Sequence, residues 1–457
     1  MAVSPARAAA FEILLKVERE HSYASELLHS ARYSKLSSPD HGLTTELVMG
    51  VLRWRSWLDH HIARASAQKI ERLDLEVLAA LRLGAYQLQF LSRVPARAAI
   101  FESVEMVKAA RKRSAGGFVN AVLRKLAAGT PGASGAAGAD AFAEILRSSN
   151  PIELARNSAH PEWIVERWAR RYGFAEAQKI CANDQTAPST ALHIYDDRAL
   201  KELAESAVTV VPGRLLSSAR IVVAGDVTRT RAHKQGRISI QDEASQLVAL
   251  LVGRGETILD CCAAPGGKTT LVAERNQDSM VIASDLHPHR ARLLRGLARR
   301  PNVRVVAADA RQLPFSEAFD RILADVPCSG TGTLARNPEI KWRLTAQDLD
   351  DLQARQIAIL KSALAQLSAG GRLIYSSCSL ECEENESVVE AALAGSPKFS
   401  IMDCREELER LRQAGELSDK LSGAMVESLV RGTYLRTIPG VHPCDGFFAA
   451  IIQKNKR

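Results

Sequence analysis

Apolar residues recur at helical spacing along the first quarter of the chain. Two sets illustrate the pattern: Ala10, Phe11, Leu14 and Val17, and then Leu78, Leu81, Ala85 and Leu88. Such spacing places the apolar side chains on one face of a helix, which is then buried against other helices. The pattern therefore predicts an all-helical domain, a small bundle, over residues 1–128.

The hydrophobic pattern weakens after this region. Residues 127–140, AAGTPGASGAAGAD, are small or turn-forming and offer little apolar surface to bury. We predict a flexible linker over residues 129–150. Residues 151–235 combine the helical pattern EWIVERWARRYG with the strand-like RIVVAG, which indicates a small α+β subdomain.

Short β-branched runs alternate with helical stretches from residue 236 to the end. Five of them are followed by turn residues and then a helix-compatible segment: ETILDCC, MVIASD, VRVVAAD, FDRILADV and GRLIYSS. This alternation is typical of a doubly wound parallel sheet. Two later runs, GTYLRTIP and GFFAAIIQ, are expected to close one edge of the sheet. Residues 236–457 are thus predicted to form an α/β domain of the Rossmann-like type.

Composition narrows the class of protein. The 457 residues suit two or three domains, and no apolar run approaches the length that crosses a bilayer. The N-terminus has no secretory signal, so we expect a cytoplasmic protein without membrane contact. Eight cysteines without a CxxC pair indicate neither a metal site nor a disulfide framework. A net charge of +8 favours a polyanionic partner, although an ordinary basic enzyme fits equally well.

The glycine-containing stretch CCAAPGGKTT, residues 261–270, resembles a phosphate-binding loop only in its second half. A Walker loop requires a glycine five residues before Gly267, and Cys262 stands there. Pro265 also removes a backbone N–H that such a loop would use. What remains is a strand, a tight Gly266-Gly267 turn and a helix start, where a ligand can approach the backbone.

Acidic residues at the ends of successive strands narrow the choice of ligand. Asp285 follows the glycines by about 20 residues, a position suited to ribose hydroxyls, and Asp309 ends the next strand, near the expected adenine. Each aspartate alone could be a helix cap. Four of them at strand ends, with Asp260 and Asp325, make a ligand site the better interpretation. A ribose and adenine site without a phosphate grip favours S-adenosylmethionine over a dinucleotide.

Two cysteines follow neighbouring predicted strands. Cys328 lies just after FDRILAD and Cys378 just after RLIYSS, so both thiols should face one crevice. A single such cysteine is more often a packed core residue. A pair beside a methyl donor suits methylation at C5 of a pyrimidine, where a thiolate adds to C6 and activates C5. Asp325 could stabilise charge at N3, and Lys268 or a helix N-terminus could lower the thiol pKa.

Several motifs together resemble a known family. They are CAAPGGKT (262–269), DVPCSGTGTLARNPEIKWR (325–343), GGRLIYSSCSLECEENE (370–386) and DGFF (445–448), with Asp285 and Asp309. The set is similar to the RsmB/NOP (Sun) family of RNA cytosine-5 methyltransferases. ELVMGVLRWRSWLD and GGFVNAVLRKLA, near the N-terminus, resemble the NusB-like RNA-binding domain of its bacterial subgroup.

The resemblance implies an S-adenosylmethionine-dependent enzyme that methylates C5 of a cytosine in 16S ribosomal RNA. It implies that Cys378 is the nucleophile, that Cys328 assists product release, and that Lys268 and Asp325 are active-site residues beside the methyl donor. The implied cofactor-binding residues are Cys262, Ala263, Ala264, Pro265, Gly266, Gly267, Lys268, Asp285, Asp309 and Asp325. Because C5 and C6 must be exposed, ribosome-free RNA is the expected substrate. We expect a monomer.

Two other classes of protein were weighed. A non-catalytic RNA-binding factor with a degenerate enzyme domain is disfavoured, because both cysteines, both glycines and all four acids are present. A nucleotide hydrolase is disfavoured by Cys262, and a dinucleotide enzyme by the missing GxGxxG pattern. Preferential binding of ATP or NAD over S-adenosylmethionine would reverse this interpretation.

Overall fold

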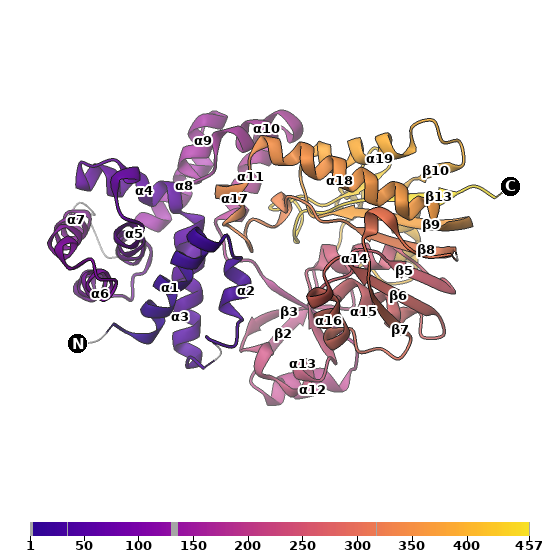
Figure 1. Ribbon diagram of the computed structural model, residues 1–457, viewed down its shortest axis with the longest axis horizontal. Helices are drawn as coiled ribbons and strands as arrows, with labels where there is room; N and C mark the ends of the chain where they lie inside the picture. Colours follow the sequence, from indigo (N-terminus) through magenta and orange to yellow (C-terminus); the bar gives the residue numbers. More distant parts are fainter. Residues whose placement is uncertain (1–2, 34, 129–135, 317, 457) are drawn as a thin grey trace. The chain divides into compact units, whose positions relative to one another are not determined.

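The computed structural model describes residues 3–33, 35–128, 136–316 and 318–456, which form two compact units. One unit consists of Met1–Ala187 together with Leu334–Arg343, and the other of Pro188–Thr333 together with Leu344–Arg457. The chain therefore passes from one unit to the other three times. Figure 1 labels most of the elements of both units.

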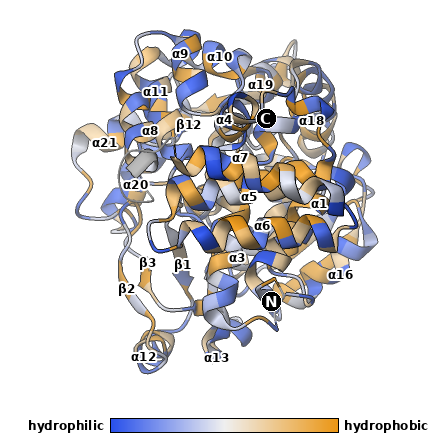
Figure 2. Cartoon of the chain, turned by 90° about the vertical axis from the view of Figure 1, so that its left-hand side faces the viewer, coloured by the Kyte–Doolittle hydropathy of each residue, from blue (hydrophilic) through white to orange (hydrophobic). Residues whose placement is uncertain are grey.

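The first unit is entirely helical in its described part, as the apolar spacing predicts. Its α-helices are α1 (Pro5–Glu20), α2 (Ala24–Leu28), α3 (Ser38–Arg53), α4 (Arg55–Ser66), α5 (Leu75–Phe90), α6 (Ala96–Ala109), α7 (Gly116–Ala128), α8 (Ala136–Arg147), α9 (Pro151–Asn157), α10 (Glu162–Tyr172), α11 (Phe174–Asp184) and α17 (Ile340–Arg343), with short 3-10 turns at Ile70–Arg72 and Arg113–Ala115. Helix α5 is buried over most of its length, from Val77 to Gln89, so the other helices pack around it. By contrast, α6 alternates hydrophobic and hydrophilic residues, as Figure 2 shows.

The structure divides the middle of the chain differently from the sequence-based expectation. Of the predicted linker 129–150, residues 129–135 lie outside the described residues, while 136–147 form helix α8. Alanine is the best helix former, and Ala141 and Ile145, four residues apart, are buried on one face. Helices α9 to α11 also belong to the first unit, so the unit boundary falls after residue 187 rather than at 150.

A small antiparallel sheet opens the second unit. Its strands are β1 (Thr190–Ile194), β2 (Thr209–Pro212), β3 (Ala219–Ala224) and β4 (Ile238–Ile240), in the order β2-β3-β1-β4. Helices α12 (Arg198–Glu205) and α13 (Arg231–Lys234) and the 3-10 turn Val227–Arg229 accompany it. Leu192, Leu203 and Ile238 are buried in its own small core. The predicted small α+β subdomain is thus present, and it begins at this sheet.

A nine-stranded mixed sheet forms the larger part of the second unit. Its strands are β5 (Thr257–Asp260), β6 (Met280–Asp285), β7 (Val303–Ala307), β8 (Phe319–Asp325), β9 (Leu367–Ser377), β10 (Phe399–Met402), β11 (Val430–Arg431), β12 (Tyr434–Arg436) and β13 (Phe448–Lys454). The order is β11-β12-β13-β9-β8-β5-β6-β7, and β10 also pairs with β13. Strands β5 to β9 are parallel, whereas β13 runs antiparallel to β9 and closes the edge. The predicted doubly wound domain is confirmed.

Consecutive strand residues enter two different cores, one on each face of this sheet. Ile258, Leu323 and Ile374 belong to one cluster, whereas their neighbours Leu259 and Ile322 belong to the other. This is the period-two alternation of a strand buried on both faces. The helices are α14 (Glu243–Leu251), α15 (Gly267–Arg275), α16 (Pro288–Leu297), α18 (Ala346–Ala365), α19 (Glu386–Leu393), α20 (Cys404–Gln413) and α21 (Gly423–Ser428), with 3-10 turns Ala310–Gln312, Thr331–Thr333 and Cys382–Glu384. Helices α14 and α15 contribute to the first cluster, and α18 and α19 to the second (Figure 1).

No helix among the described residues has both the length and the apolar character needed to cross a membrane.

Candidate active site

A cavity of about 590 Å³ opens at the carboxyl ends of the parallel strands. The strand order reverses between β5 and β8, and a crevice at such a point is the usual ligand site of an open α/β sheet. The lining residues come mainly from the segments that follow β5, β6, β7, β8 and β9: Cys261, Cys262, Ala264, Asp285, Leu286, His287, Arg290, Asp309, Ala310, Arg311, Asp325, Val326, Pro327, Cys328, Arg355, Ile359 and Cys378. Both cysteines singled out by the sequence are among them.

The thiols of Cys328 and Cys378 lie against each other at this cavity. Their sulfur atoms are 3.2 Å apart, and the backbone N–H of Cys378 donates to the sulfur of Cys328 at 3.3 Å. Strands β8 and β9 bring them together, because Asp325 pairs in register with Ser376 and each cysteine follows closely after its strand. The pKa of Cys328 lies well above the ordinary value of a thiol. The largest cause is its hydrogen bond with Cys378, and the second is burial. The pair therefore retains a proton on Cys328.

An ion pair between Lys268 and Asp325 borders the thiols. The ammonium of Lys268 donates to Oδ2 of Asp325 at 2.7 Å, and the hydroxyl of Ser376 donates to Oδ1 at 2.8 Å. Burial opposes ionisation of Lys268, but the charge of Asp325 and its hydrogen bond leave the Lys268 pKa above its ordinary value. The ammonium also lies 4.9 Å from the centre of the Phe447 ring, within cation–π range.

The glycine turn connects β5 to helix α15. Gly266 has φ +114°, a conformation that side chains other than glycine rarely adopt, and Gly267 begins the helix. Of the predicted cofactor residues here, Cys262 and Ala264 line the cavity, whereas Ala263, Pro265, Gly266, Gly267 and Lys268 are absent from its lining as far as the chain is described. Ala263, Pro265, Gly266 and Gly267 form the turn that leads into helix α15, where Lys268 is the second residue. Hydrogen bonding with Cys261, together with burial, raises the pKa of Cys262, so this thiol stays protonated.

Asp285 and Asp309 both line the cavity, at the ends of β6 and β7. The carboxylate of Asp285 accepts from the backbone N–H of His287 at 3.1 Å and lies 3.8 Å from the guanidinium of Arg290. The side chain of Asp309 accepts from Arg311 at 2.7 Å, an interaction that lowers the pKa of Asp309. Asp309 also caps the turn that follows it, so the structure combines the cap role with a place in the cavity wall.

Two buried oxygen atoms near the glycine turn are left without a hydrogen-bond donor in the described structure. They are Oδ1 of Asp260, at the end of β5, and Oε1 of Gln241. Oδ2 of Asp260 accepts from the hydroxyl of Thr269 at 2.7 Å. Burial nevertheless raises the pKa of Asp260 to about 7. Unpaired buried acceptors are costly, and they are commonly explained by a ligand or water that supplies the donor.

Comparison with known proteins decides the family. Residues 247–453 match the family described as 16S rRNA methyltransferase RsmB/F, and residues 4–128 match the NusB family. A Bacillus subtilis protein, "Probable ribosomal RNA small subunit methyltransferase B", is 34% identical over 461 residues, covering 97% of this chain and 98% of that protein. The chain belongs to the RsmB/F family of 16S rRNA methyltransferases. "Ribosomal RNA small subunit methyltransferase B" of Vibrio cholerae is 32% identical over 98% of this chain and 97% of that protein.

Solved structures share the fold of this RsmB/F family member. A crystal structure of PH0851 matches with a TM-score of 0.77 and 22% identity, covering 99% of both chains. A structure described as NSun6 from Pyrococcus horikoshii with SFG matches with a TM-score of 0.54 and 19% identity, covering 65% of this chain and 99% of that chain. At these identities the likeness concerns the fold alone.

Sequence reasoning missed several residues of the RsmB/F site. His287, Arg290 and Arg355 line the cavity and were not anticipated. For His287 and Arg290, the position just after β6 and Asp285 was an available signal. Arg355 comes from the middle of helix α18, and nothing in its local pattern distinguishes it from a solvated helix residue.

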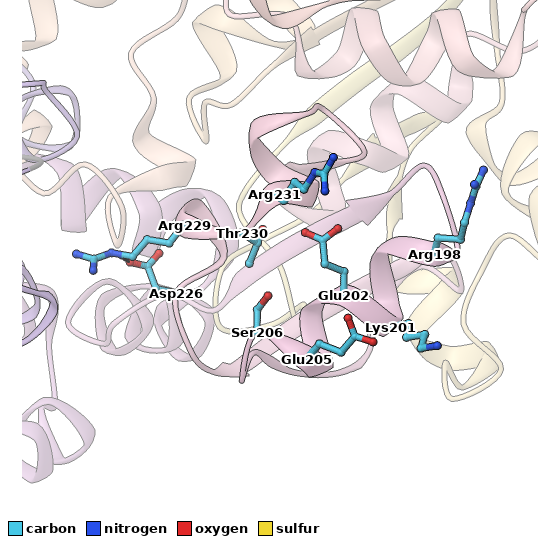
Figure 3. A pocket seen from close by; sticks show the side chains of 9 residues that line it. All are labelled: Arg198, Lys201, Glu202, Glu205, Ser206, Asp226, Arg229, Thr230 and Arg231. Carbon is cyan, nitrogen blue, oxygen red and sulfur yellow. Dashed lines mark ion pairs between the residues drawn. The ribbon is translucent and has the colours of Figure 1, made fainter.

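A second cavity, of about 490 Å³, lies in the small subdomain and differs in its chemistry. Figure 3 shows its charged side chains, which come from helix α12 and from residues 226–231. Acidic and basic groups are mixed: Arg229 pairs with Asp226 at 3.1 Å, and Glu202 pairs with Arg237. None of the residues that the sequence predicted for the site belongs to this cavity.

Proposed function

We propose that this RsmB/F enzyme transfers a methyl group from S-adenosylmethionine to C5 of a cytosine in 16S rRNA through a covalent bond between Cys378 and C6. The observation that carries the proposal is the pair of thiols, 3.2 Å apart, at a cavity that Asp285 and Asp309 also line. One sulfur can bond to the base while the other remains within reach of the same ring.

The residues at the cavity fit the proposed cofactor. S-adenosylmethionine, when bound, supplies an electrophilic methyl group on a sulfonium. Asp285 would accept from ribose hydroxyls, and Asp309 from the adenine amino group. The unpaired oxygens of Asp260 and Gln241 are suited to an ammonium group, the donor-rich end of an amino acid. The cavity wall and the buried oxygens near the glycine turn thus offer acceptors for each polar end of the molecule.

Cys378 acts as the nucleophile because the proton of the pair is held on Cys328. The Cys328 thiol can donate its hydrogen to the Cys378 sulfur and stabilise it as a thiolate. The thiolate adds to C6, forming an S–C bond and moving electron density onto C5, which then takes the methyl group.

Charge at N3 and the proton at C5 require two further groups. Asp325, which accepts from Lys268 at 2.7 Å, is proposed to serve N3 by sharing that proton with it, and the proton returns to Lys268 when the C5–C6 double bond re-forms. Once Cys378 is bonded to carbon, the main cause of the raised Cys328 pKa is removed, and the Cys328 thiol can give its proton to solvent water. The Cys328 thiolate then takes the C5 proton, and the electron pair of that C–H bond forms the C5–C6 double bond and expels Cys378 from C6 as a thiolate.

The remaining parts of the chain are assigned to RNA binding. Residues 1–128 are proposed to bind the RNA, and the subdomain within 151–235 to contact it near the methylated base, which residues 236–457 modify. The cytosine must be unpaired or turned out of its helix, since the thiol approaches the ring face. Ribosome-free 16S rRNA should therefore be the preferred substrate, bound by a monomer.

Cysteine variants test the covalent route. Cys378→Ala should abolish turnover and form no covalent RNA complex, whereas Cys328→Ala should accumulate one because the product is not released. The measurement is a denaturing gel of the enzyme with labelled 16S rRNA and S-adenosylmethionine. Cys404→Ala, at a buried cysteine outside the cavity lining, is the control and should behave as the natural enzyme. The reverse pattern of complexes would exchange the roles of the two thiols.

A further inference from the structure

A buried acid outside the cavity lining holds the segments that carry both cysteines. Glu384 ends the 3-10 turn Cys382–Glu384, between β9 and helix α19, and its side chain is inaccessible to solvent. The cavity lining does not include it in the described structure. Burying a carboxylate is costly unless donors surround it, so its partners indicate what it does.

Glu384 accepts hydrogen bonds from the residue that follows each cysteine. The backbone N–H of Ser329 donates to it at 2.8 Å, and the Ser329 hydroxyl donates as well. The hydroxyl of Ser379 donates at 2.5 Å, and the two serine hydroxyls are 3.1 Å apart. The two Cys-Ser pairs therefore lie side by side. Their sulfur atoms contact each other, and their serine hydroxyl groups both donate to Glu384.

A second set of contacts holds Glu384 itself. The amide of Gln356, a buried residue of helix α18, donates to the carboxylate and to the carbonyl of Pro327, each at 2.9 Å. The hydroxyl of Tyr375, in β9, donates to the backbone carbonyl of Glu384 at 2.6 Å. Three segments of the unit donate to this carboxylate and a fourth to the backbone carbonyl of Glu384, so the residue cannot shift without moving the turns that carry Cys328 and Cys378.

The contacts of Glu384 are hydrogen bonds rather than ion pairs. Within the described residues, no Lys, Arg or His side chain forms a salt bridge with it. Its charge therefore acts on neighbouring groups. It contributes to the raised pKa of Cys328, although the hydrogen bond with Cys378 and burial are larger causes. Asp325 acts on Cys328 in the same direction. Tyr375, the other titratable group close to Cys328, is kept neutral because burial holds its pKa well above its ordinary value.

We propose that Glu384 is a positioning residue that fixes the separation of the two thiols and makes Cys378 the more reactive of the pair. This inference rests on the proposed function for its consequence in catalysis. The two cysteines then differ in reactivity before any RNA binds. Sequence alone could not assign this role, because the acid belongs to a run of four acidic residues among six, ECEENE.

The decisive experiment compares Glu384→Gln with the natural full-length enzyme in the absence of RNA. Iodoacetamide labelling followed by peptide mass spectrometry gives the separate alkylation rates of Cys328 and Cys378 across a pH series. In the natural enzyme Cys378 should react first. Removing one nearby charge changes a pKa by roughly one unit, so the rate ratio of Cys378 to Cys328 should fall about tenfold in Glu384→Gln. Glu390→Gln, on the exposed side of helix α19, is the control and should keep the natural ratio.

Turnover provides the second readout. A loosened thiol pair should lower kcat by on the order of 10²-fold, with the KM for RNA unchanged, since Glu384 contacts neither substrate. If Glu384→Gln does not fold, Ser379→Ala removes one donor while keeping the charge, and the alkylation ratio should still shift by about threefold. A ratio equal to that of Glu390→Gln in a folded variant overturns the proposal. If the ratio shifts but the natural enzyme forms no Cys378–RNA complex, the role of Glu384 holds and the covalent function fails.

Discussion

The buried carboxyl of Asp260 should make stability and cofactor affinity depend on pH in opposite directions. Its pKa is raised from 3.8 to about 7, so the folded protein keeps a proton that the unfolded chain loses between these values. Stability from this group is therefore complete below about pH 4 and is lost as the pH rises through about 7. A shift of three units corresponds to on the order of 4 kcal/mol at this site, which is 2% exposed.

Binding of S-adenosylmethionine should strengthen over the same range, because the ionised carboxylate is the better acceptor for its ammonium group. Titration calorimetry should show roughly tenfold tighter binding at about pH 8 than at about pH 6, as the ionised fraction rises. The Asp260→Asn side chain has the shape of the natural one but cannot ionise. The variant should therefore bind S-adenosylmethionine more weakly and with an affinity that does not depend on pH. An Asn variant with the natural pH dependence would assign that dependence to another group.

At the scale of single residues, motifs in the sequence indicate the reactive groups but not the residues that hold those groups in place. Cys328, Cys378, Lys268 and Asp325 stand at strand ends, and a parallel sheet brings such ends together. Glu384 and Gln356 support the thiols through contacts between segments 28 and 55 residues apart. Which of several neighbouring acids turns inward depends on that packing, and no local period in the sequence encodes it.

At the scale of elements, the strands that lie in β-branched runs follow from the sequence, whereas two other strands and one helix do not. The five parallel strands and the two edge strands β12 and β13 follow from β-branched runs bounded by turns. Strands β10 (FSIM) and β11 (VR) contain one β-branched residue each, so neither stands out as a β-branched run. They exist because β13 and β12 offer edges with free backbone groups. Helix α8 was missed because alanine suits both a loop composition and a helix.

The loop after Cys328 should tolerate no side chain at Gly332. A Cβ there would lie 2.2 Å from the carbonyl oxygen of Gly446, a backbone atom that cannot rotate away. The N–H of Gly332 also donates to the carbonyl of Cys378 at 2.9 Å. Gly332→Ala should cost about 1–3 kcal/mol in thermal or urea unfolding and lower kcat, because the loop must move away from Cys378.

A glycine without this constraint provides the comparison for Gly332. Gly296, inside helix α16, has no atom within 4 Å of a built Cβ. Gly296→Ala should raise the free energy of unfolding by up to about 1 kcal/mol, because alanine loses less backbone entropy in a helix. Equal effects of the two substitutions would show that the contact between Gly332 and Gly446 does not restrict the loop.

At the scale of the whole molecule, the two units share one continuous motif. DVPCSGTGTLARNPEIKWR carries Cys328 in the second unit, yet its residues 334–343 belong to the helical unit. The ammonium of Lys341 is buried there and donates to the carbonyls of Arg53 and Ala159, each at 3.0 Å. The indole of Trp342 donates to the carbonyl of Leu52 at 2.8 Å. A motif read along the sequence as catalytic is thus also part of the helical core, which composition and spacing could not reveal.

Separation of the units should therefore expose this segment. In a fragment of residues 188–457, Lys341 and Arg343 lose the carbonyls to which they donate, including that of Val17 at 2.7 Å from Arg343. The segment also loses the helices that bury it, so it has neither packing nor backbone partners to hold it and should unfold locally. Trypsin should then cut after Lys341 and Arg343 at least about tenfold faster than in the full chain, as timed digestion and mass spectrometry would measure.

Cleavage after the exposed Lys420 should proceed equally in the fragment and in the full chain, and it serves as the internal control. Equal protection of Lys341 in the fragment and in the full chain would mean that the segment keeps its structure without the helices that surround it.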